Sequence, residues 1–239
     1  MMFYSGPFGI KIRKEFEQPY NEHSMTSGRW AGPGIGGEDK YEMAFLEKAV
    51  ATAQNIFTMV ELGCGYARWL VNGAKLCEQA GIKDVHLIGV EASRRRFEFA
   101  LQHLADNQID FLCDMYNMGV GAKHGIAAIA DDMDYGSALH GVGNVTVEPL
   151  AYFLPDGPID YLCMDIQGAE ADVLESSIDV LPRCRFIHVA THSFDVAERC
   201  KKVMAALPFE HVGSVPKDIV VDGVRFIDGM EQWRRLAVK

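Results

Sequence analysis

The sequence predicts an α/β fold built around a mostly parallel sheet. From Phe57 onward, short apolar runs alternate with segments of helical periodicity, and a chain that alternates strands with helices forms a parallel sheet. Residues 59–65 (MVELGCG) place a buried strand before a glycine turn, and residues 87–91 (LIGVE) form a second apolar strand that ends in a carboxylate. A strand, a tight turn, a helix and an acid-ended strand together make one nucleoside-binding half of such a sheet.

Length and composition predict one soluble domain. The chain has 239 residues, of which 49% are hydrophobic and 23% charged, so it is long enough to bury a full core and is not disordered by composition. Its net charge of −10 repels phosphate groups, and we therefore expect neither nucleic acid nor an anionic membrane as a partner. The six cysteines form no C-x-x-C pair, and no apolar run is long enough for a signal or a membrane span. These features are typical of a cytoplasmic protein.

Residues 1–40 are polar and rich in turn-forming residues, and they end in a glycine-rich run. Such a segment has little side-chain area to contribute to a core, so we expect an N-terminal arm or lid ahead of a domain that spans residues 41–239. His23, Arg29 and Trp30 precede the glycine run, where an aromatic ring and a cation could close over a bound ligand. The alternative is that they are surface residues of the arm with no catalytic part.

The first half of the domain is predicted to contain three helices that alternate with two strands. Glu38 and Asp39 begin the first helix, because acidic side chains suit a helix N-terminus. The glycine turn leads into the second helix, and Ser93 is placed to cap the third, which follows the acid-ended strand. Each helix carries one apolar stripe. The stripes are Phe45, Leu46, Ala49, Val50 and Ala53, then Ala67, Leu70, Val71, Ala74 and Cys77, then Phe97, Ala100, Leu101 and Leu104.

The second half is predicted to continue the parallel sheet around one insertion. Residues 117–158 break the alternation with glycines and a turn signal, so we expect them to lie over the active edge of the sheet. Asp222 and Gly223 form a type I′ turn signal, which predicts an antiparallel hairpin that finishes the sheet. Pro208 marks the end of the last helix. The predicted elements are strands at 110–113, 144–148, 159–165 and 185–191, helices from about residue 169 and at 196–207, and hairpin strands at 218–221 and 224–227.

The glycine turn also predicts the cofactor. Gly63 and Gly65 let the backbone turn tightly and approach a ligand, while Glu61 ends the strand beside them. A dinucleotide site would need a small residue where Arg68 stands, to leave room for a pyrophosphate. A carboxylate at Glu61 would repel a pyrophosphate but attract an ammonium or sulfonium group, which indicates S-adenosylmethionine. The alternative is an ordinary strand-to-helix turn, because a lone G-x-G is weak evidence.

Glu91 is predicted to bind the ribose of that cofactor. It ends the strand after the glycine turn, close to the spacing of about 20 residues at which an acid accepts hydrogen bonds from ribose hydroxyls. Ala92 and Ser93 follow it and are expected to belong to the same cofactor-binding turn. The alternative for Glu91 is a surface carboxylate at a strand end.

Residues 159–170 (IDYLCMDIQGAE) carry the third set of candidate functional residues. Asp165 lies at the end of an apolar strand, Gly168 permits a close turn, and Glu170 lies in the first turn of the next helix. Here the chain resembles the FkbM family of S-adenosylmethionine-dependent methyltransferases, whose hallmark is a strand that ends in a D-[VI]-[EQ]-G-x-E run. The resemblance covers residues 57–230. It implies a Rossmann-like class I methyltransferase fold, whose mostly parallel seven-stranded sheet has helices on both faces and an antiparallel strand near the C-terminus.

The resemblance also implies roles for particular residues in a methyltransferase domain at 41–239. Glu61, Gly63 and Gly65 match the methionine-binding turn, and Glu91 matches the ribose acid. The signature residues at the methyl-transfer edge are Asp165, Gln167, Gly168 and Glu170. Two positions depart from the family pattern, since Gln167 stands where many members carry Glu and Ala190 stands where members often carry an acid.

His192 is predicted to act as a general base. It ends the strand that follows the Asp165 strand, and the carboxyl ends of neighbouring parallel strands meet at one edge of a sheet. A neutral imidazole oriented by a carboxylate can take a proton from a substrate hydroxyl, so Asp165, His192 and Glu170 are the candidate catalytic residues. One alternative is a structural histidine held by Asp165. Another is a divalent ion bound by the same three residues, which ranks lower because paired carboxylates near a helix start are commonly structural. His188, two residues earlier, is expected in the core.

The predicted function is transfer of a methyl group from S-adenosylmethionine to a hydroxyl oxygen of a small molecule, a sugar or a natural product. One alternative is a nicotinamide-dependent oxidoreductase on a related sheet, which Arg68 disfavours. The other is a non-catalytic partner protein that binds S-adenosylmethionine without turnover. Contacts with the acceptor are expected from the N-terminal arm and from residues 117–158.

Overall fold

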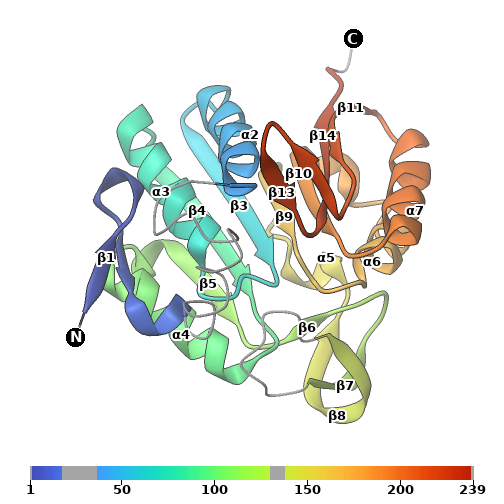
Figure 1. Ribbon diagram of the computed structural model, residues 1–239, viewed down its shortest axis with the longest axis horizontal. Coiled ribbons are helices and arrows are strands. Elements are labelled where there is room, and N and C mark those ends of the chain that lie inside the picture. Colours follow the sequence, from blue (N-terminus) through green and yellow to red (C-terminus); the bar gives the residue numbers. More distant parts are fainter. Residues whose placement is uncertain (1, 18–36, 130–137, 238–239) are drawn as a thin grey trace.

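A seven-stranded sheet forms the centre of the molecule (Figure 1). The structure, a computed structural model, describes residues 2–17, 37–129 and 138–237. In spatial order the strands are β11 (Phe209–Val215), β14 (Gly229–Arg235), β10 (Cys184–Thr191), β9 (Ile159–Met164), β3 (Ile56–Leu62), β4 (Asp84–Val90) and β5 (Cys113–Tyr116). β14 is antiparallel to both of its neighbours, whereas the other pairings in this sheet are parallel. The predicted sheet, with one antiparallel strand near the C-terminus, is confirmed.

Helices cover both faces of this sheet (Figure 1). One face packs against α2 (Asp39–Ala51), α3 (Arg68–Ala80) and α4 (Arg94–Asp106), and the other packs against α5 (Leu150–Phe153), α6 (Glu170–Ser176) and α7 (Phe194–Ala205). Successive residues of a strand face opposite sides, so Met59 lies in the hydrophobic cluster of the first face and Val60 in that of the second. Because both faces are buried, the strands read as continuous apolar runs in the sequence.

The first residues of the chain pack on the core, contrary to the expectation that all of residues 1–40 contribute little to it. β1 (Phe3–Ser5) and β2 (Lys11–Arg13) form a hairpin around the 3-10 turn η1 (Pro7–Gly9), and η2 (Lys14–Glu17) follows. Ile10, Ile12 and Phe16 are buried against α3 and α4. Their apolar side chains are spaced among charged residues, which concealed the pattern. Residues 18–36, with His23, Arg29 and Trp30, lie outside the described residues, so the arm or lid stays a prediction.

Phe16 should be essential for this packing. Its ring is fully buried and stacks on Tyr66 with a centroid separation of 5.6 Å, and it also contacts Phe99 at 5.1 Å. Phe16→Ala is expected to lower the free energy of unfolding by about 3–5 kcal/mol, measured by urea denaturation. Phe111→Ala is the control, because that ring is 79% exposed and its loss should change stability by about 0.5 kcal/mol or less. Equal effects of the two variants would contradict the packing.

The segment after β5 builds a second, three-stranded sheet near the C-terminal ends of the central strands (Figure 1). It consists of β6 (Gly119–Val120), β7 (Gly125–Ile129) and β8 (Leu139–Glu148). The strand expected at 144–148 is the second half of β8, which pairs antiparallel with β7 and parallel with β6. The chain then returns through α5 to β9 in the central sheet.

Two element predictions were wrong. Residues 110–112 form a 3-10 turn, η3, so β5 begins only at Cys113, because Phe111 faces solvent instead of a core. The predicted hairpin exists as β12 (Ile219–Val221) and β13 (Val224–Phe226), but these strands pair only with each other. A further 3-10 turn, η4 (Leu181–Arg183), precedes β10. Within the described ranges, no helix combines the length and apolar character that a membrane crossing requires.

Candidate active site

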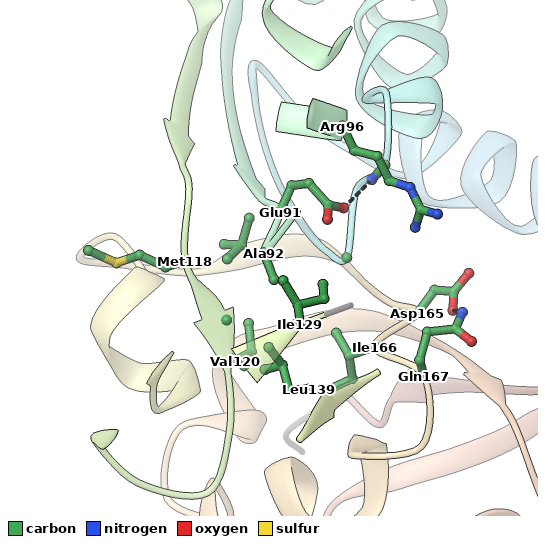
Figure 2. Close-up of a pocket in the computed structure, with 14 residues that line it drawn as sticks. Glu91, Ala92, Arg96, Met118, Val120, Ile129, Leu139, Asp165, Ile166 and Gln167 are labelled. Atoms are coloured by element: carbon green, nitrogen blue, oxygen red, sulfur yellow. Dashed lines mark hydrogen bonds between the residues drawn. The ribbon is translucent and has the colours of Figure 1, made fainter. Parts of the chain in front are cut away.

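A cavity opens where β3, β4 and β9 end at their carboxyl edges, the position at which α/β sheets bind ligands. The empty space at this site is about 550 Å³, a volume that includes the open solvent at its mouth. The turns after these three strands form one wall, and the β6–β8 sheet contributes apolar side chains to the other (Figure 2). The described parts of the insertion, residues 117–129 and 138–158, therefore lie over the active edge, as expected from the sequence.

The glycine turn after β3 lines this cavity through Gly63 and Gly65, whose φ values are +74° and +56°. Both values lie in the left-handed region that favours glycine. The amides of Gly63 and Cys64 donate to the carbonyl of Val90, at 2.8 and 3.0 Å. A Cβ on Gly63 would lie 1.8 Å from the carbonyl oxygen of Asp165. The absence of a side chain at Gly63 therefore allows the end of β9 to pack against this turn. Its effect on a bound ligand is indirect, because that packing sets the shape of the cavity.

Glu91 is at the cavity wall and holds the glycine turn in place (Figure 2). Its Oε2 accepts a hydrogen bond from the amide of Gly65, and its Oε1 accepts one from the amide of Ser93, both at 2.8 Å. The residue is only 5% exposed, and this burial raises the pKa of its carboxyl group, although the two amide donors oppose the rise. Ala92 also lines the cavity, as expected.

Glu61 and Ser93, which were predicted as cofactor contacts, are not among the residues that line the cavity. The carboxylate of Glu61 is buried beneath the start of α3, where its Oε2 accepts from the amide of Leu70 at 3.0 Å. Burial raises the pKa of this carboxyl group well above its ordinary value. The hydroxyl of Ser93 accepts from the amide of Arg96 at 3.4 Å, which confirms it as the cap of α4. Both side chains stabilise helix starts next to the cavity.

The three candidate catalytic residues are brought together at the ends of β9 and β10. Nε2 of His192 lies 3.2 Å from Oδ1 of Asp165, and Nδ1 of His192 lies 2.8 Å from Oε1 of Glu170. Glu170 is fully buried, and the same Oε1 accepts the amides of Ile166 and Gly168, each at 3.1 Å. Left-handed φ angles at Gln167 (+58°) and Gly168 (+106°) wrap this turn around the carboxylate. Of the three candidates only Asp165 lines the cavity.

The electrostatics at His192 disagree with its prediction as a free base. Burial by itself lowers the pKa of the imidazole, but the contacts with Asp165 and Glu170 outweigh burial and raise the pKa to about 10. Without a bound metal ion, a pKa of this size favours the protonated ring at neutral pH, which has no lone pair to accept a proton. The 3.2 Å contact of Nε2 with Asp165 is an ion pair that lacks hydrogen-bond alignment.

His188 confirms its assignment to the core. It is 1% exposed, and burial lowers the pKa of its imidazole to about 4. Its Nδ1 lies 3.3 Å from Nε2 of Gln232, and its Nε2 lies 3.5 Å from Glu42.

Sequence reasoning missed the residues that complete the cavity. Arg96 lies 9% exposed at its wall, on the buried face of α4. The signal in the sequence was the position of this basic residue on the apolar stripe of the helix, where a buried charge usually has a function or a partner. The apolar wall comes from Met118, Val120, Ile129 and Leu139. No sequence signal identified these residues, because the insertion has neither helical nor strand periodicity along most of its length.

Comparison with known proteins identifies the family of the chain. The sequence model described as the Methyltransferase FkbM domain matches residues 86–215. A protein of Jannaschia sp. (strain CCS1), named "Putative methyltransferase", is 31% identical over 183 residues. That alignment covers 67% of this chain and 65% of the relative, so the chain spans just under two thirds of the relative's length.

Solved structures share the fold. The methyltransferase FkbM from Methylobacillus flagellatus KT superposes with a TM-score of 0.51 at 14% identity, over 76% of this chain and 45% of that one. The "putative rRNA-methylase" from Clostridium thermocellum superposes with a TM-score of 0.54 at 9% identity, over 85% and 98% of the two chains. At such identities the likeness shows the Rossmann-like fold alone. The domain match and the Jannaschia relative together show that the chain belongs to the FkbM methyltransferase family.

Proposed function

We propose that this protein transfers a methyl group from S-adenosylmethionine to a hydroxyl oxygen of a small molecule. The observation that carries the proposal is the cavity at the ends of β3, β4 and β9. One part of its lining is suited to a nucleoside, and another part presents an exposed carboxylate. Glu91 and an apolar slot lie along the wall, and Asp165 lies at the other end. A buried carboxylate beside apolar side chains suits a ribose and a purine ring. Membership of the FkbM family supports the same reading.

The chain's own residues supply position and a proton acceptor. S-adenosylmethionine, when bound, supplies a methyl group on a positively charged sulfur. Gly65 lets the backbone approach the cofactor, Gly63 lets the same turn pack against the end of β9, and Glu91 accepts hydrogen bonds from ribose hydroxyls. Glu61 acts one step away, by holding the start of α3 beside the turn. Aligning the two reactants in this way accounts for most of the rate in a direct displacement.

Asp165, not His192, is the group that would take the acceptor's proton. Its side chain is 51% exposed at the cavity, whereas the His192 side chain is 14% exposed and lies behind it. Oδ1 of Asp165 accepts from Nε2 of Gln167 at 2.8 Å and contacts His192, and these contacts orient the carboxylate. Oδ2 is then available to a hydroxyl. His192 is thus a positioning residue in this proposal, held in turn by Glu170.

Calorimetry followed by a turnover assay tests this function. The protein should bind S-adenosylmethionine and S-adenosylhomocysteine but not NAD; the reverse preference would favour the oxidoreductase alternative. S-adenosylmethionine carrying a labelled methyl group should then yield labelled product with a hydroxyl acceptor from a panel of sugars, polyketides and peptides. Tight binding without turnover on any acceptor would favour the non-catalytic partner protein. Transfer of the label to RNA would show that the acceptor is RNA and not a small molecule. The net charge of −10 argues against binding of such a polyanion.

Glu91→Ala should weaken S-adenosylhomocysteine binding by at least about tenfold. The variant loses hydrogen bonds to a charged group, which are typically worth about 1.5–3 kcal/mol each, and it also releases the amide of Gly65. Isothermal titration calorimetry measures the change. Glu78→Ala is the matched control, because that carboxylate is 69% exposed at the far end of α3 and pairs only with Lys75 among the contacts within the described residues. An unchanged dissociation constant in folded Glu91→Ala would remove Glu91 from the ribose site.

A further inference from the structure

The contacts of His192 follow the pattern of a metal-binding histidine. Histidines that bind a metal through one ring nitrogen almost always donate the other N–H to a carboxylate, which fixes the tautomer and aims the ligating nitrogen. Here Nδ1 lies 2.8 Å from Oε1 of Glu170, which is fully buried and fixed by two backbone amides. A proton on Nδ1 leaves Nε2 as the nitrogen that faces Asp165. Glu170 thus aims the free nitrogen of His192 at a second carboxylate.

Two buried polar atoms of this cluster have no hydrogen-bond partner among the described residues: Nε2 of His192 and Oε2 of Glu170. Buried polar atoms of folded proteins nearly always have a partner, so each exception needs an explanation, and an ion is one of the common ones. Donor atoms of Asp165, Glu170 and His192 lie within 4.8 Å of one another. The unpaired atoms therefore occur where three potential ligands converge.

The separation of Nε2 and Asp165 Oδ1 is suited to a shared cation. At 3.2 Å the two atoms are in contact without hydrogen-bond alignment. Two ligands at adjacent octahedral positions, each about 2.0–2.2 Å from a metal, lie about 3 Å apart. Asp165 and His192 could therefore bind one ion with only small side-chain adjustments.

Two further carboxyl groups are coupled electrostatically to Asp165. Asp228 and Glu38, from the segments after β13 and before α2, are partly buried, and burial and the charge of Asp165 both raise the pKa of each group, that of Glu38 to about 7. A nearby divalent cation would favour the charged form of both groups. Lys217 donates to the carbonyl oxygen of His192 at 3.1 Å and places one positive charge beside the cluster.

We propose that Asp165 and His192 bind a divalent cation, with Glu170 as the carboxylate that orients the imidazole. One nitrogen and otherwise oxygen donors favour an ion such as Mn²⁺ over one that prefers sulfur. Water or an acceptor hydroxyl could complete the coordination from the exposed side of Asp165. A hydroxyl bound to such an ion would have a lower pKa and would pass its proton to Oδ2 of Asp165 more readily. This last role rests on the proposed methyl transfer, whereas binding of the ion does not.

Mn²⁺ binding without cofactor tests the site. Titration followed by electron paramagnetic resonance should show one saturable site on the wild-type protein. The pulsed spectrum should contain the coupling of a directly bound imidazole nitrogen. His192→Ala should abolish that coupling and lower Mn²⁺ affinity by at least about tenfold, and Glu170→Gln should lower it about 10–100-fold. His86→Ala is the control, because His86 also contacts an aspartate, Asp114 at 2.8 Å, but lies exposed on β4. It should leave both readouts unchanged.

The outcomes separate this proposal from the proposed function. No saturable Mn²⁺ site on the wild-type protein, or affinity and nitrogen coupling that survive in His192→Ala, would overturn the metal site. Circular dichroism and urea denaturation of each variant show whether its fold is intact, independently of cofactor binding. The imidazole nitrogen coupling is measured on the wild-type protein. The site can therefore be tested even if a variant misfolds. If the wild-type protein bound Mn²⁺ but not S-adenosylmethionine, only the methyltransferase proposal would be contradicted.

Discussion

Gly63→Ala is expected to destabilise the protein by about 2–5 kcal/mol and to abolish S-adenosylhomocysteine binding. Two effects add. A left-handed conformation costs a residue with a Cβ about 1–2 kcal/mol, and forcing an atom into a filled space costs about 1–3 kcal/mol more. The space is filled by the Asp165 carbonyl, 1.8 Å from the new Cβ, and backbone cannot rotate away as a flexible side chain can. Separating β3 from the end of β9 would also displace Asp165 from the cavity.

Gly81→Ala separates these two effects. Gly81 ends α3 with φ of +75°, nearly equal to the +74° of Gly63, but a Cβ there would meet nothing within 4 Å. It should therefore show only the conformational cost of about 1–2 kcal/mol and bind S-adenosylhomocysteine normally. Urea denaturation and calorimetry on both variants measure the difference. If Gly63→Ala were no less stable than Gly81→Ala, the close approach of β3 and β9 would be disproved.

Asp165→Asn should lower turnover by about 10²–10⁴ while S-adenosylhomocysteine affinity changes little. An amide cannot take a proton from the acceptor, and general-base assistance is typically worth that factor. The variant keeps the shape of the side chain but loses the charge that faces His192. Single-turnover methyl transfer under saturating cofactor isolates the chemical step, and calorimetry checks cofactor affinity in parallel.

Asp114→Asn is the matched control for this prediction. Asp114 is 62% exposed on β5 and contacts His86, so it forms a second aspartate–histidine pair outside the cavity. Its replacement should leave turnover within about twofold of wild type, as for a surface substitution of this kind. Comparable turnover in Asp165→Asn and the wild-type protein would exclude Asp165 as the proton acceptor.

The sequence predicted the sheet where both faces of a strand are apolar. β3, β4 and β9 could be located because packing helices cover both sides, which leaves nearly uninterrupted apolar runs. β11 and β14 could not, because β11 is largely exposed and polar and a buried position of β14 holds a carboxylate that pairs with polar residues of β11. Glu231 is 1% exposed on β14, and its carboxylate contacts His211 at 2.6 Å and Ser214 at 3.0 Å, both on β11. In a sequence, an acidic residue predicts an exposed loop position, and its burial can be recognised only when its hydrogen-bond partners are known.

The site was predictable in position and less so in the direction of its side chains. The contact between Asp165 and His192 follows from topology, because the ends of adjacent parallel strands must meet at one edge. The side chain of Glu61 could face either the cavity or the helix, and sequence does not show that the amide of Leu70 binds it. The pKa of His192 depends on Glu170 approaching from the other side of the ring, through a turn whose left-handed residues no periodicity reveals.

The position of β14 between β10 and β11 has a consequence for how the protein is made. β11 precedes β14 in the sequence but pairs with the central sheet only through it. During translation, residues 209–215 therefore emerge from the ribosome before the strand that they must pair with has emerged, and the edge of β10 stays open for the same interval. Until residues 229–235 have also left the ribosome, the nascent chain exposes unpaired edges on β10 and β11. This interval is where a chaperone would be most needed, and where pairing with another nascent copy would compete with correct folding.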